Sequence, residues 1–125
     1  MEQKKNKDAI RSELCVVIIL KMLSKEKRYA YDIIQNMNSI FKDFLNFQRG
    51  TIYPTLYRME ADGFITSEKV VISGMRRERI YYCITNEGEK ELERLSQKYL
   101  ELSRLIIKVL NDEIDFSDLP NKKII

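Results

Sequence analysis

The sequence predicts an α+β fold that is mainly α: a winged helix-turn-helix of three helices and a β-hairpin, followed by a long C-terminal helix. Three observations predict it. Apolar residues recur at helical spacing in three early segments, two later runs are rich in β-branched and aromatic residues, and the last segment carries an apolar seam. We expect a winged-helix domain over residues 8–85, a dimerisation helix over 86–112 and a flexible tail over 113–125.

The composition argues against an enzyme or a metal protein. The chain has 125 residues, enough for one modest core, and its net charge of +3 permits a nucleic-acid partner without requiring one. Histidine, the commonest general base and metal ligand, is missing. Cys15 and Cys83 lie far apart within apolar stretches, where reduced, buried thiols are expected. We expect no catalytic site, no metal and no cofactor.

Nothing in the sequence resembles a membrane or secretion segment. The longest apolar run covers residues 14–20, whereas a membrane span needs about 20 residues. The polar, lysine-rich stretch over residues 1–7 precedes a run that is too short for a signal peptide and lacks a small-residue cleavage site. We therefore expect a cytoplasmic protein with no membrane partner.

The first two helices are predicted over residues 8–24 and roughly 30–42. The first is apolar around most of its circumference, so it should be buried on more than one side, by a second subunit or around a ligand cavity. Leu14 and Ile18 are its candidates for a dimer interface. The second helix has apolar residues at amphipathic spacing, and Asp32 suits the positive end of its dipole.

A third helix is predicted from about residue 50 to 62. If Thr51 is its N-cap, Pro54 falls at the third helical position, where its missing N–H costs nothing. Asp62 and Gly63 end the helix, because glycine readily takes a left-handed conformation.

The third helix has an inner face marked by Ile52, Leu56 and Met59. Of its two tyrosines, we expect Tyr57 nearer the core and Tyr53 nearer an interface. Spacing from the inner face predicts that the outward residues are Thr51, Tyr53, Pro54, Thr55 and Arg58, with Arg49 just before the helix.

Residues 64–72 and 79–85 read as two strands of a β-hairpin, joined by a short basic turn. Taken singly, each basic residue here is most simply a solvated surface charge. Together they cluster at the tip of the predicted wing: Lys69, Arg76, Arg77 and Arg79.

The last helix is predicted over about 86–112, capped by Thr85 or Asn86, with Glu87 and Glu89 in its first turn. Packing on the chain's own core is one interpretation of its apolar seam. We favour an intersubunit seam, because the helix is too long for one side of a small domain to cover. The seam residues are Leu92, Leu95, Tyr99, Leu102, Ile106 and Val109.

Three helices followed by a hairpin favour binding to double-stranded DNA, with the third helix entering the major groove by its N-terminal end. Hydroxyls and an arginine on the outward face suit contacts with phosphates and base edges. The basic hairpin tip could lie along the minor groove or the adjacent backbone. The alternative is a winged-helix module that docks a partner protein without binding DNA, since fold alone does not fix function.

Three stretches resemble the PadR family of bacterial transcriptional regulators. Residues 29–33 (YAYDI) are similar to its HGYEL stretch, and residues 50–65 (GTIYPTLYRMEADGFI) to its GTLYPLLHRLExxGLI signature. Residues 77–88 (RERIYYCITNEG) resemble its RKYYxLTxxG segment. The resemblance covers about residues 10–110 and implies a repressor that dimerises through its last helix on a pseudo-palindromic operator. It adds Tyr31 to the DNA-binding candidates, although Tyr29 and Ala30 replace the usual His-Gly.

The resemblance also implies a site for a small hydrophobic or flat aromatic effector that could release the DNA. The chain looks like the small subgroup of the family, in which multidrug-sensing members hold such compounds in a pore against a tryptophan on the last helix. Tyr99 occupies that position here, and plain seam packing is the other interpretation of this residue. The remaining candidates are Ile10, Glu13, Val17 and Ser103.

Overall fold

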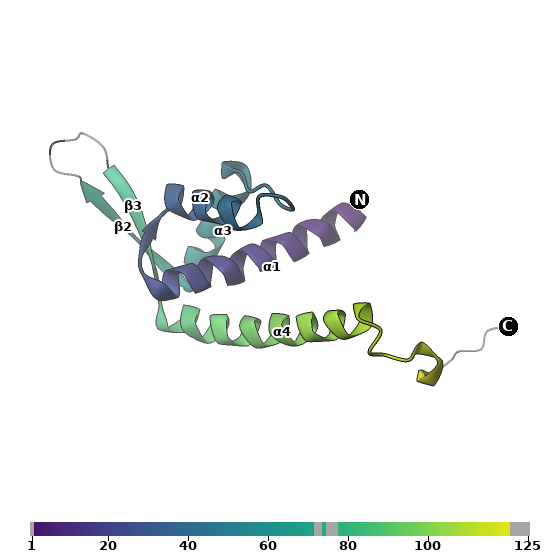
Figure 1. The fold of residues 1–125 in the computed structure, drawn as a ribbon. Coiled ribbons are helices and arrows are strands. Elements are labelled where there is room, and N and C mark those ends of the chain that lie inside the picture. Colours follow the sequence, from purple (N-terminus) through teal and green to yellow (C-terminus); the bar gives the residue numbers. More distant parts are fainter. Residues whose placement is uncertain (1, 72–73, 75–77, 121–125) are drawn as a thin grey trace. The chain divides into compact units, whose positions relative to one another are not determined.

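The computed structural model describes residues 2–71, 74 and 78–120, with the side chains of the first helix described from Ser12 onward. It confirms the predicted fold class: helices dominate, and a small antiparallel sheet accompanies them (Figure 1). The elements are α1 (Glu2–Lys25), β1 (Arg28–Tyr29), α2 (Ala30–Phe41), α3 (Arg49–Ala61), β2 (Ile65–Val71), β3 (Glu78–Ile84), α4 (Asn86–Leu110) and the short 3-10 helix η1 (Phe116–Asp118).

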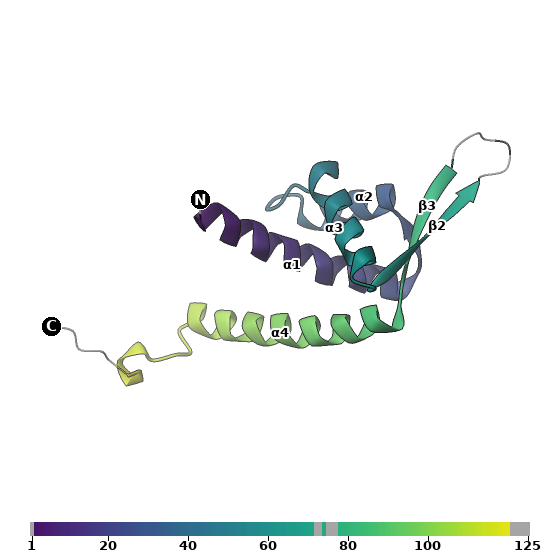
Figure 2. The same ribbon diagram turned by 180° about the vertical axis from the view of Figure 1, so that it is seen from behind.

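The chain forms two compact units, Met1–Glu93 and Arg94–Ile125, and each is described by itself. The first unit contains α1 to β3 and the opening turns of α4. The second contains the rest of α4 and η1. Within the first unit, α1, α2 and α3 pack together and the hairpin of β2 and β3 stands out from them (Figure 2).

The core of the first unit comes from the apolar faces that the sequence pattern predicted. Cys15 and Cys83 are not joined in a disulfide; Cys15 is buried as expected, whereas Cys83 is only half-buried. The largest wholly buried side chains come from all three helices, from the segment between α2 and α3, and from β2: Ile19, Leu20, Ile33, Met37, Phe47, Ile52, Leu56, Met59 and Ile65.

The sheet has the strand order β1-β3-β2, and both pairings are antiparallel. The sequence did not predict β1, because two residues carry no periodicity. Aromatic rings hold this short strand to its neighbour: Tyr29 and Tyr81 meet edge to face with ring centroids 5.5 Å apart. Cations cover both rings, since Arg79 lies 4.6 Å from the centre of Tyr29 and Lys27 lies 5.4 Å from that of Tyr81.

Helix α3 begins earlier than predicted, because its N-cap lies three residues before Thr51, the predicted cap. Its N-cap is Gln48, so Thr51 is the third helical residue and Pro54 the sixth. The backbone N–H groups of Thr51 and Ile52 both donate to the Gln48 carbonyl, at 3.0 Å, which closes the first turn without a threonine cap. Pro54 therefore does remove one helical hydrogen bond, to the carbonyl of residue 50. The cost is small because that residue is exposed to water.

The start of α4 matches its prediction and closes a four-way junction. The Thr85 hydroxyl accepts a hydrogen bond from the Gly88 N–H at 3.0 Å and donates one to the Gly63 carbonyl at 2.6 Å. The Thr85 N–H donates to the Phe64 carbonyl at 3.0 Å. Gly63 has φ +83°, the left-handed conformation predicted for the end of α3. One threonine thus joins the end of α3, both wing strands and α4.

Gly88 allows this junction to close, because a Cβ at this position would lie only 2.1 Å from the Phe64 carbonyl oxygen. That oxygen belongs to the backbone and cannot rotate away. We predict that Gly88→Ala lowers the free energy of unfolding by about 2–3 kcal/mol, at the upper end of the cost of overpacking. Urea denaturation followed by circular dichroism measures this change.

The matched control is Gly50→Ala, which makes the same chemical change inside α3. A Cβ at Gly50 meets nothing within 4 Å. We expect this variant to be as stable as the parent or more stable by about 0.5–1 kcal/mol, because alanine is the better helix former. Equal effects of the two substitutions would contradict the steric role of Gly88.

Candidate nucleic-acid interface

The connection between α2 and α3 is fixed by one side chain, Asn38. Its Nδ2 donates to the Phe47 carbonyl at 2.8 Å, and its Oδ1 accepts from the Phe47 N–H at 2.7 Å. The Phe47 ring is buried and meets Phe41 edge to face with centroids 5.7 Å apart. The amide thus replaces the backbone partners that this turn lacks, and it sets where α3 begins. The sequence analysis missed this role.

Asn38→Ala leaves both polar backbone groups of Phe47 without their partner. Because Phe47 is buried, we predict that this substitution lowers the free energy of unfolding by about 2 kcal/mol, the usual cost of unpaired buried groups. Asn38→Asp retains an acceptor for the Phe47 N–H but loses the donor to its carbonyl. It should therefore lower the free energy of unfolding by less than Asn38→Ala does. Thermal and urea denaturation of the two variants test this order, and an alanine variant as stable as the parent would contradict it.

The outward face of α3 differs from its prediction at two positions. Thr55 is only 2% exposed, and its hydroxyl donates to the Thr51 carbonyl at 2.8 Å, so the expectation that it faces outward is wrong. A hydroxyl that bonds back to its own helix can be buried without an outside partner. Tyr57, expected nearer the core, is 78% exposed. Arg49 and Tyr53 are exposed as expected, and Thr51 is half-buried.

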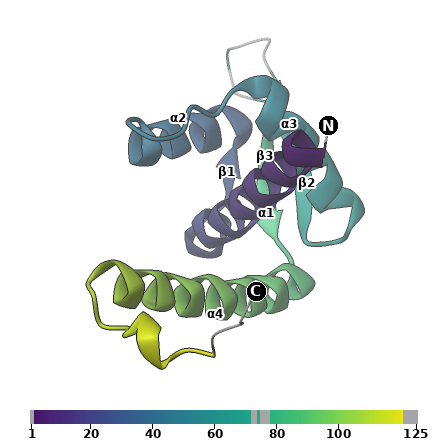
Figure 3. The same ribbon diagram turned by 90° about the vertical axis from the view of Figure 1, so that its right-hand side faces the viewer.

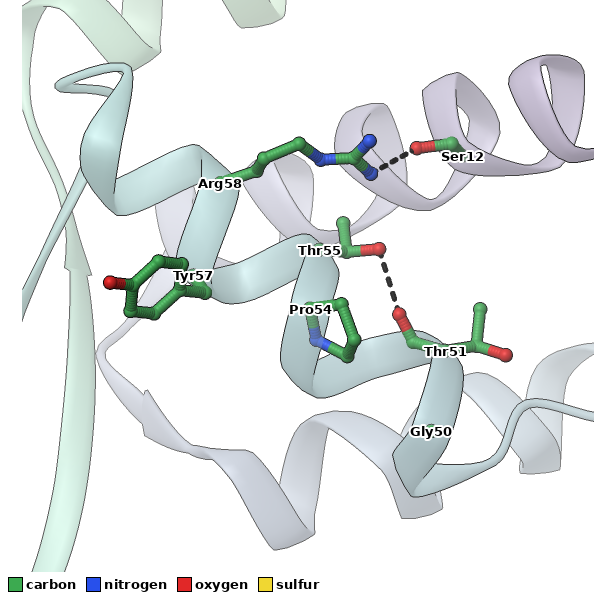
Figure 4. Close-up of a pocket in the computed structure, with 7 residues that line it drawn as sticks. All are labelled: Ser12, Gly50, Thr51, Pro54, Thr55, Tyr57 and Arg58. Carbon is green, nitrogen blue, oxygen red and sulfur yellow. Dashed lines mark hydrogen bonds between the residues drawn. The ribbon is translucent and has the colours of Figure 1, made fainter.

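Arg58 is exposed, and its guanidinium reaches across to α1. Its Nη2 donates to the Ser12 hydroxyl at 2.5 Å, and Figure 4 shows the side chain extending from α3 toward that residue. The bond lies at a cavity of about 540 Å³ between the two helices. The other residues lining the cavity come from α3: Gly50, Thr51, Pro54, Thr55 and Tyr57. Arg58 thus has a contact within the chain that the sequence did not predict.

The remaining DNA-binding candidates that the structure describes, together with Arg79, lie on α2, β2 and β3. Tyr31, in the first turn of α2, is 53% exposed. Lys69 is exposed on β2. Arg79 lies over the Tyr29 ring, so its charge already makes a cation–π interaction within the sheet. The two remaining wing candidates, Arg76 and Arg77, lie outside the described residues.

Tyr82 on β3 is buried. Burial raises the pKa of its hydroxyl, and the negative charges of Glu60 and of an ionised Tyr53 raise it further. The phenol therefore stays neutral over the physiological range. Glu60 accepts a hydrogen bond from the Ser67 hydroxyl at 2.5 Å, which ties α3 to β2.

The predicted dimer residues fall in both units. In the first unit Leu14, Ile18 and Leu92 are half-buried. In the second unit Leu95 is buried and Tyr99 is half-buried, whereas the later seam residues, Leu102, Ile106 and Val109, are exposed. Their shared role stays a prediction.

The predicted effector residues likewise come from both units. Glu13 and Val17 are half-buried in the first unit, and Ser103 is exposed in the second beside half-buried Tyr99. Ile10 lies in α1, but its side chain is outside the described part. Their grouping around a ligand stays a prediction.

Comparison with known proteins identifies the family. Residues 19–94, which include α2, α3 and the hairpin, match the family described as transcriptional regulator PadR-like. The chain belongs to the PadR-like family of transcriptional regulators. This membership agrees with the expectation that it is not an enzyme. Among the described residues, none of the helices has the length and apolar character needed to cross a membrane.

Two curated relatives support this family membership. One is a transcriptional regulator of Mycobacterium tuberculosis, 41% identical over 58 residues that cover 46% of this chain and 52% of that protein. The other is the negative transcriptional regulator PadR of Bacillus subtilis, 32% identical over 74 residues that cover 59% of this chain and 40% of that protein. The matches therefore span about half the length of these relatives, or less.

Solved PadR-like structures share the fold over most of their length. A PadR-like transcription factor from Bacteroides fragilis superposes with a TM-score of 0.69 at 30% identity, covering 84% of this chain and 98% of that one. A PadR-like transcriptional regulator from Bacillus cereus gives a TM-score of 0.66 at 29% identity, covering 76% and 89%. This structural similarity supports the interpretation of the first unit as a winged helix.

Proposed function

We propose that this chain is a transcriptional repressor that binds duplex DNA with the exposed face of α3. The N-terminal end of that helix carries the proposal. No side chain caps it, no acidic residue lies in its first turn, and Arg49 is its first residue. Uncapped N–H groups beside an arginine form a positive end suited to phosphate. The side chains that accompany it are Thr51, Tyr53, Tyr57 and Arg58 of α3, Tyr31 of α2 and Lys69 of the wing.

Repression is supported by likeness to a relative, and the pseudo-palindromic operator is part of the proposal. The Bacillus subtilis relative is named a negative transcriptional regulator. A palindromic site requires two copies of α3 related by a two-fold axis, so the proposal includes a homodimer. Release of DNA by a small hydrophobic effector remains a further part of this prediction.

The second unit supports dimerisation. Consecutive turns of α4 present exposed apolar side chains, which is costly in water unless another surface covers them. Leu105, Ile106, Val109 and Leu110 line a shallow apolar depression of about 210 Å³ on this unit. A second copy of α4 presents the same side chains, so a two-fold contact can cover both.

The DNA-binding proposal is tested by titrating the protein into a labelled duplex taken from the region upstream of its own gene. We expect binding that weakens steeply with salt, because phosphate contacts release counterions. Arg49→Ala should lower the affinity by about tenfold and reduce the salt slope by about one. A protein that retards no duplex even at low salt would favour the protein-docking alternative.

The role of Arg58 in DNA binding has to be tested with two variants, because its guanidinium already donates a hydrogen bond to Ser12. If Arg58 contacts DNA, Arg58→Ala should weaken binding by about tenfold, while Ser12→Ala frees the guanidinium and leaves binding intact or stronger. If Arg58 serves only the link between α1 and α3, the two variants should behave alike. Anisotropy titrations of both variants on the same duplex separate these roles, and equal losses would remove Arg58 from the proposed interface.

The dimer is tested with Ile106→Glu, which places a charge in the apolar seam of α4. We predict that this variant sediments as a monomer at concentrations where the parent is dimeric, because a buried unpaired carboxylate costs several kcal/mol, at least about 3. The control is Lys108→Glu, which adds an acid two residues after Ile106 but outside the seam. This variant should leave the dimer intact. A parent protein that sediments as a monomer would refute the homodimer.

A further inference from the structure

Three exposed residues of α3 form a strip along one side of the helix. Gly50, Pro54 and Tyr57 follow one another at intervals of four and three residues, which places them on the same helical face. All three line the cavity of about 540 Å³ that lies between α3 and α1, two helices that contact each other within the first unit (Figure 3). Because these residues are exposed, another molecule can reach the strip from solvent.

Gly50 leaves a notch at one end of this strip. Glycine stabilises a helix less than alanine does, so a glycine in the first turn of α3 needs a reason. The fold does not supply one, because its φ is not positive and a Cβ at Gly50 would meet no atom within 4 Å. A glycine that its own chain does not require is typical of a backbone that a ligand approaches closely.

Pro54 and Tyr57 give the notch an apolar border. The Pro54 ring is exposed and its nitrogen carries no hydrogen to donate, while Tyr57 is 78% exposed. Figure 4 shows the Pro54 ring between Tyr57 and Thr51 along the helix. The buried hydroxyl of Thr55 already donates to the Thr51 carbonyl. The middle of the strip therefore offers a partner mainly hydrocarbon surface.

The surroundings of the notch indicate which apolar group enters it. Arg49 directly precedes Gly50, and Arg58 directly follows Tyr57, so a cation stands at each end of the strip. In the major groove, base pairs present hydrogen-bonding groups and a single apolar one, the C5 methyl group of thymine. An apolar notch between two cations thus matches a thymine methyl group with phosphates on either side.

We propose that the notch at Gly50 receives the C5 methyl group of a thymine, which makes Pro54 and Tyr57 specificity-determining residues. This inference rests on the proposed function, since it requires α3 to enter the major groove of duplex DNA. The missing side chain at Gly50 lets the base edge approach the helix, and the two rings contact the methyl group. Cytosine presents an amino donor in the groove, which the apolar border would leave without an acceptor. The notch therefore selects thymine at one base-pair position.

The test uses the full-length protein and the labelled duplex that it binds, with each thymine replaced in turn by deoxyuridine. Uracil differs from thymine only by the methyl group. At one position, or at its symmetry-related partner, the replacement should weaken binding by about threefold to fivefold, the effect of one buried methyl group. 5-Bromouracil carries a bromine of about the size of a methyl group and should restore binding there. Fluorescence anisotropy measures each affinity.

Variants connect this effect to the notch. Gly50→Ala fills it, so this variant should bind the thymine duplex about tenfold more weakly and no longer distinguish thymine from uracil. Its free energy of unfolding should not fall, which separates a lost contact from a damaged fold. Tyr57→Ala should reduce the thymine–uracil difference to about twofold or less. The matched control is Phe44→Ala, which removes an aromatic side chain that is 88% exposed and outside the cavity lining. It should leave the difference unchanged.

The outcomes separate this inference from the proposal on which it rests. A duplex that is bound equally well after every replacement of thymine would overturn the notch and leave DNA binding by α3 standing. A Gly50→Ala variant that keeps the full thymine–uracil difference, or that is less stable than the parent, would also overturn it. A protein that binds no duplex would overturn both proposals.

Discussion

The hydroxyl of Thr85 is the contact on which the arrangement of the first unit depends. A hydroxyl has one hydrogen and two lone pairs, so a single side chain can donate to the Gly63 carbonyl and accept from the Gly88 N–H. The backbone N–H of the same residue donates to the Phe64 carbonyl. The end of α3, the base of the wing and the start of α4 therefore share one fixed point. The angle between the helix and the wing follows from that point, because neither can move without breaking a bond to Thr85.

The sequence predicted the structure best in segments where a regular pattern or a local signal defines the element. The apolar spacing of α2, the capped start of α4 and the two wing strands were all predicted, because each depends on residues close together in the chain. The position of Gly63 and the Thr85 cap were also predicted, since both follow from local backbone chemistry. These are also positions within the segments that resemble the family, where local chemistry and family pattern coincide.

The errors occur where a residue's partner lies elsewhere in the fold or where two local solutions compete. Thr51 is a reasonable N-cap by type, but the Gln48 carbonyl accepts from its N–H instead, so the helix starts earlier. Thr55 was placed outside by its spacing from the apolar face of α3, yet it is buried, and its hydroxyl bonds to its own helix and needs no solvent. The Asn38 clamp on Phe47 spans a connection without periodicity, and the contact of Arg58 with Ser12 joins residues far apart in sequence. No local pattern reports such contacts.

The two long helices that flank the wing begin in opposite ways, and the contrast bears on function. Helix α4 has a hydroxyl cap and two glutamates in its first turn, which is how a helix start is stabilised. Helix α3 has neither, and it gives up a stabilisation of about 1 kcal/mol that a good capping residue supplies. A carboxylate there would repel phosphate, and a capping side chain would occupy the N–H groups that phosphate needs. The weaker helix start is therefore the one that the proposed DNA contact would use. The Asn38 clamp holds the segment before α3, and the junction at Thr85 holds the residue that follows its end.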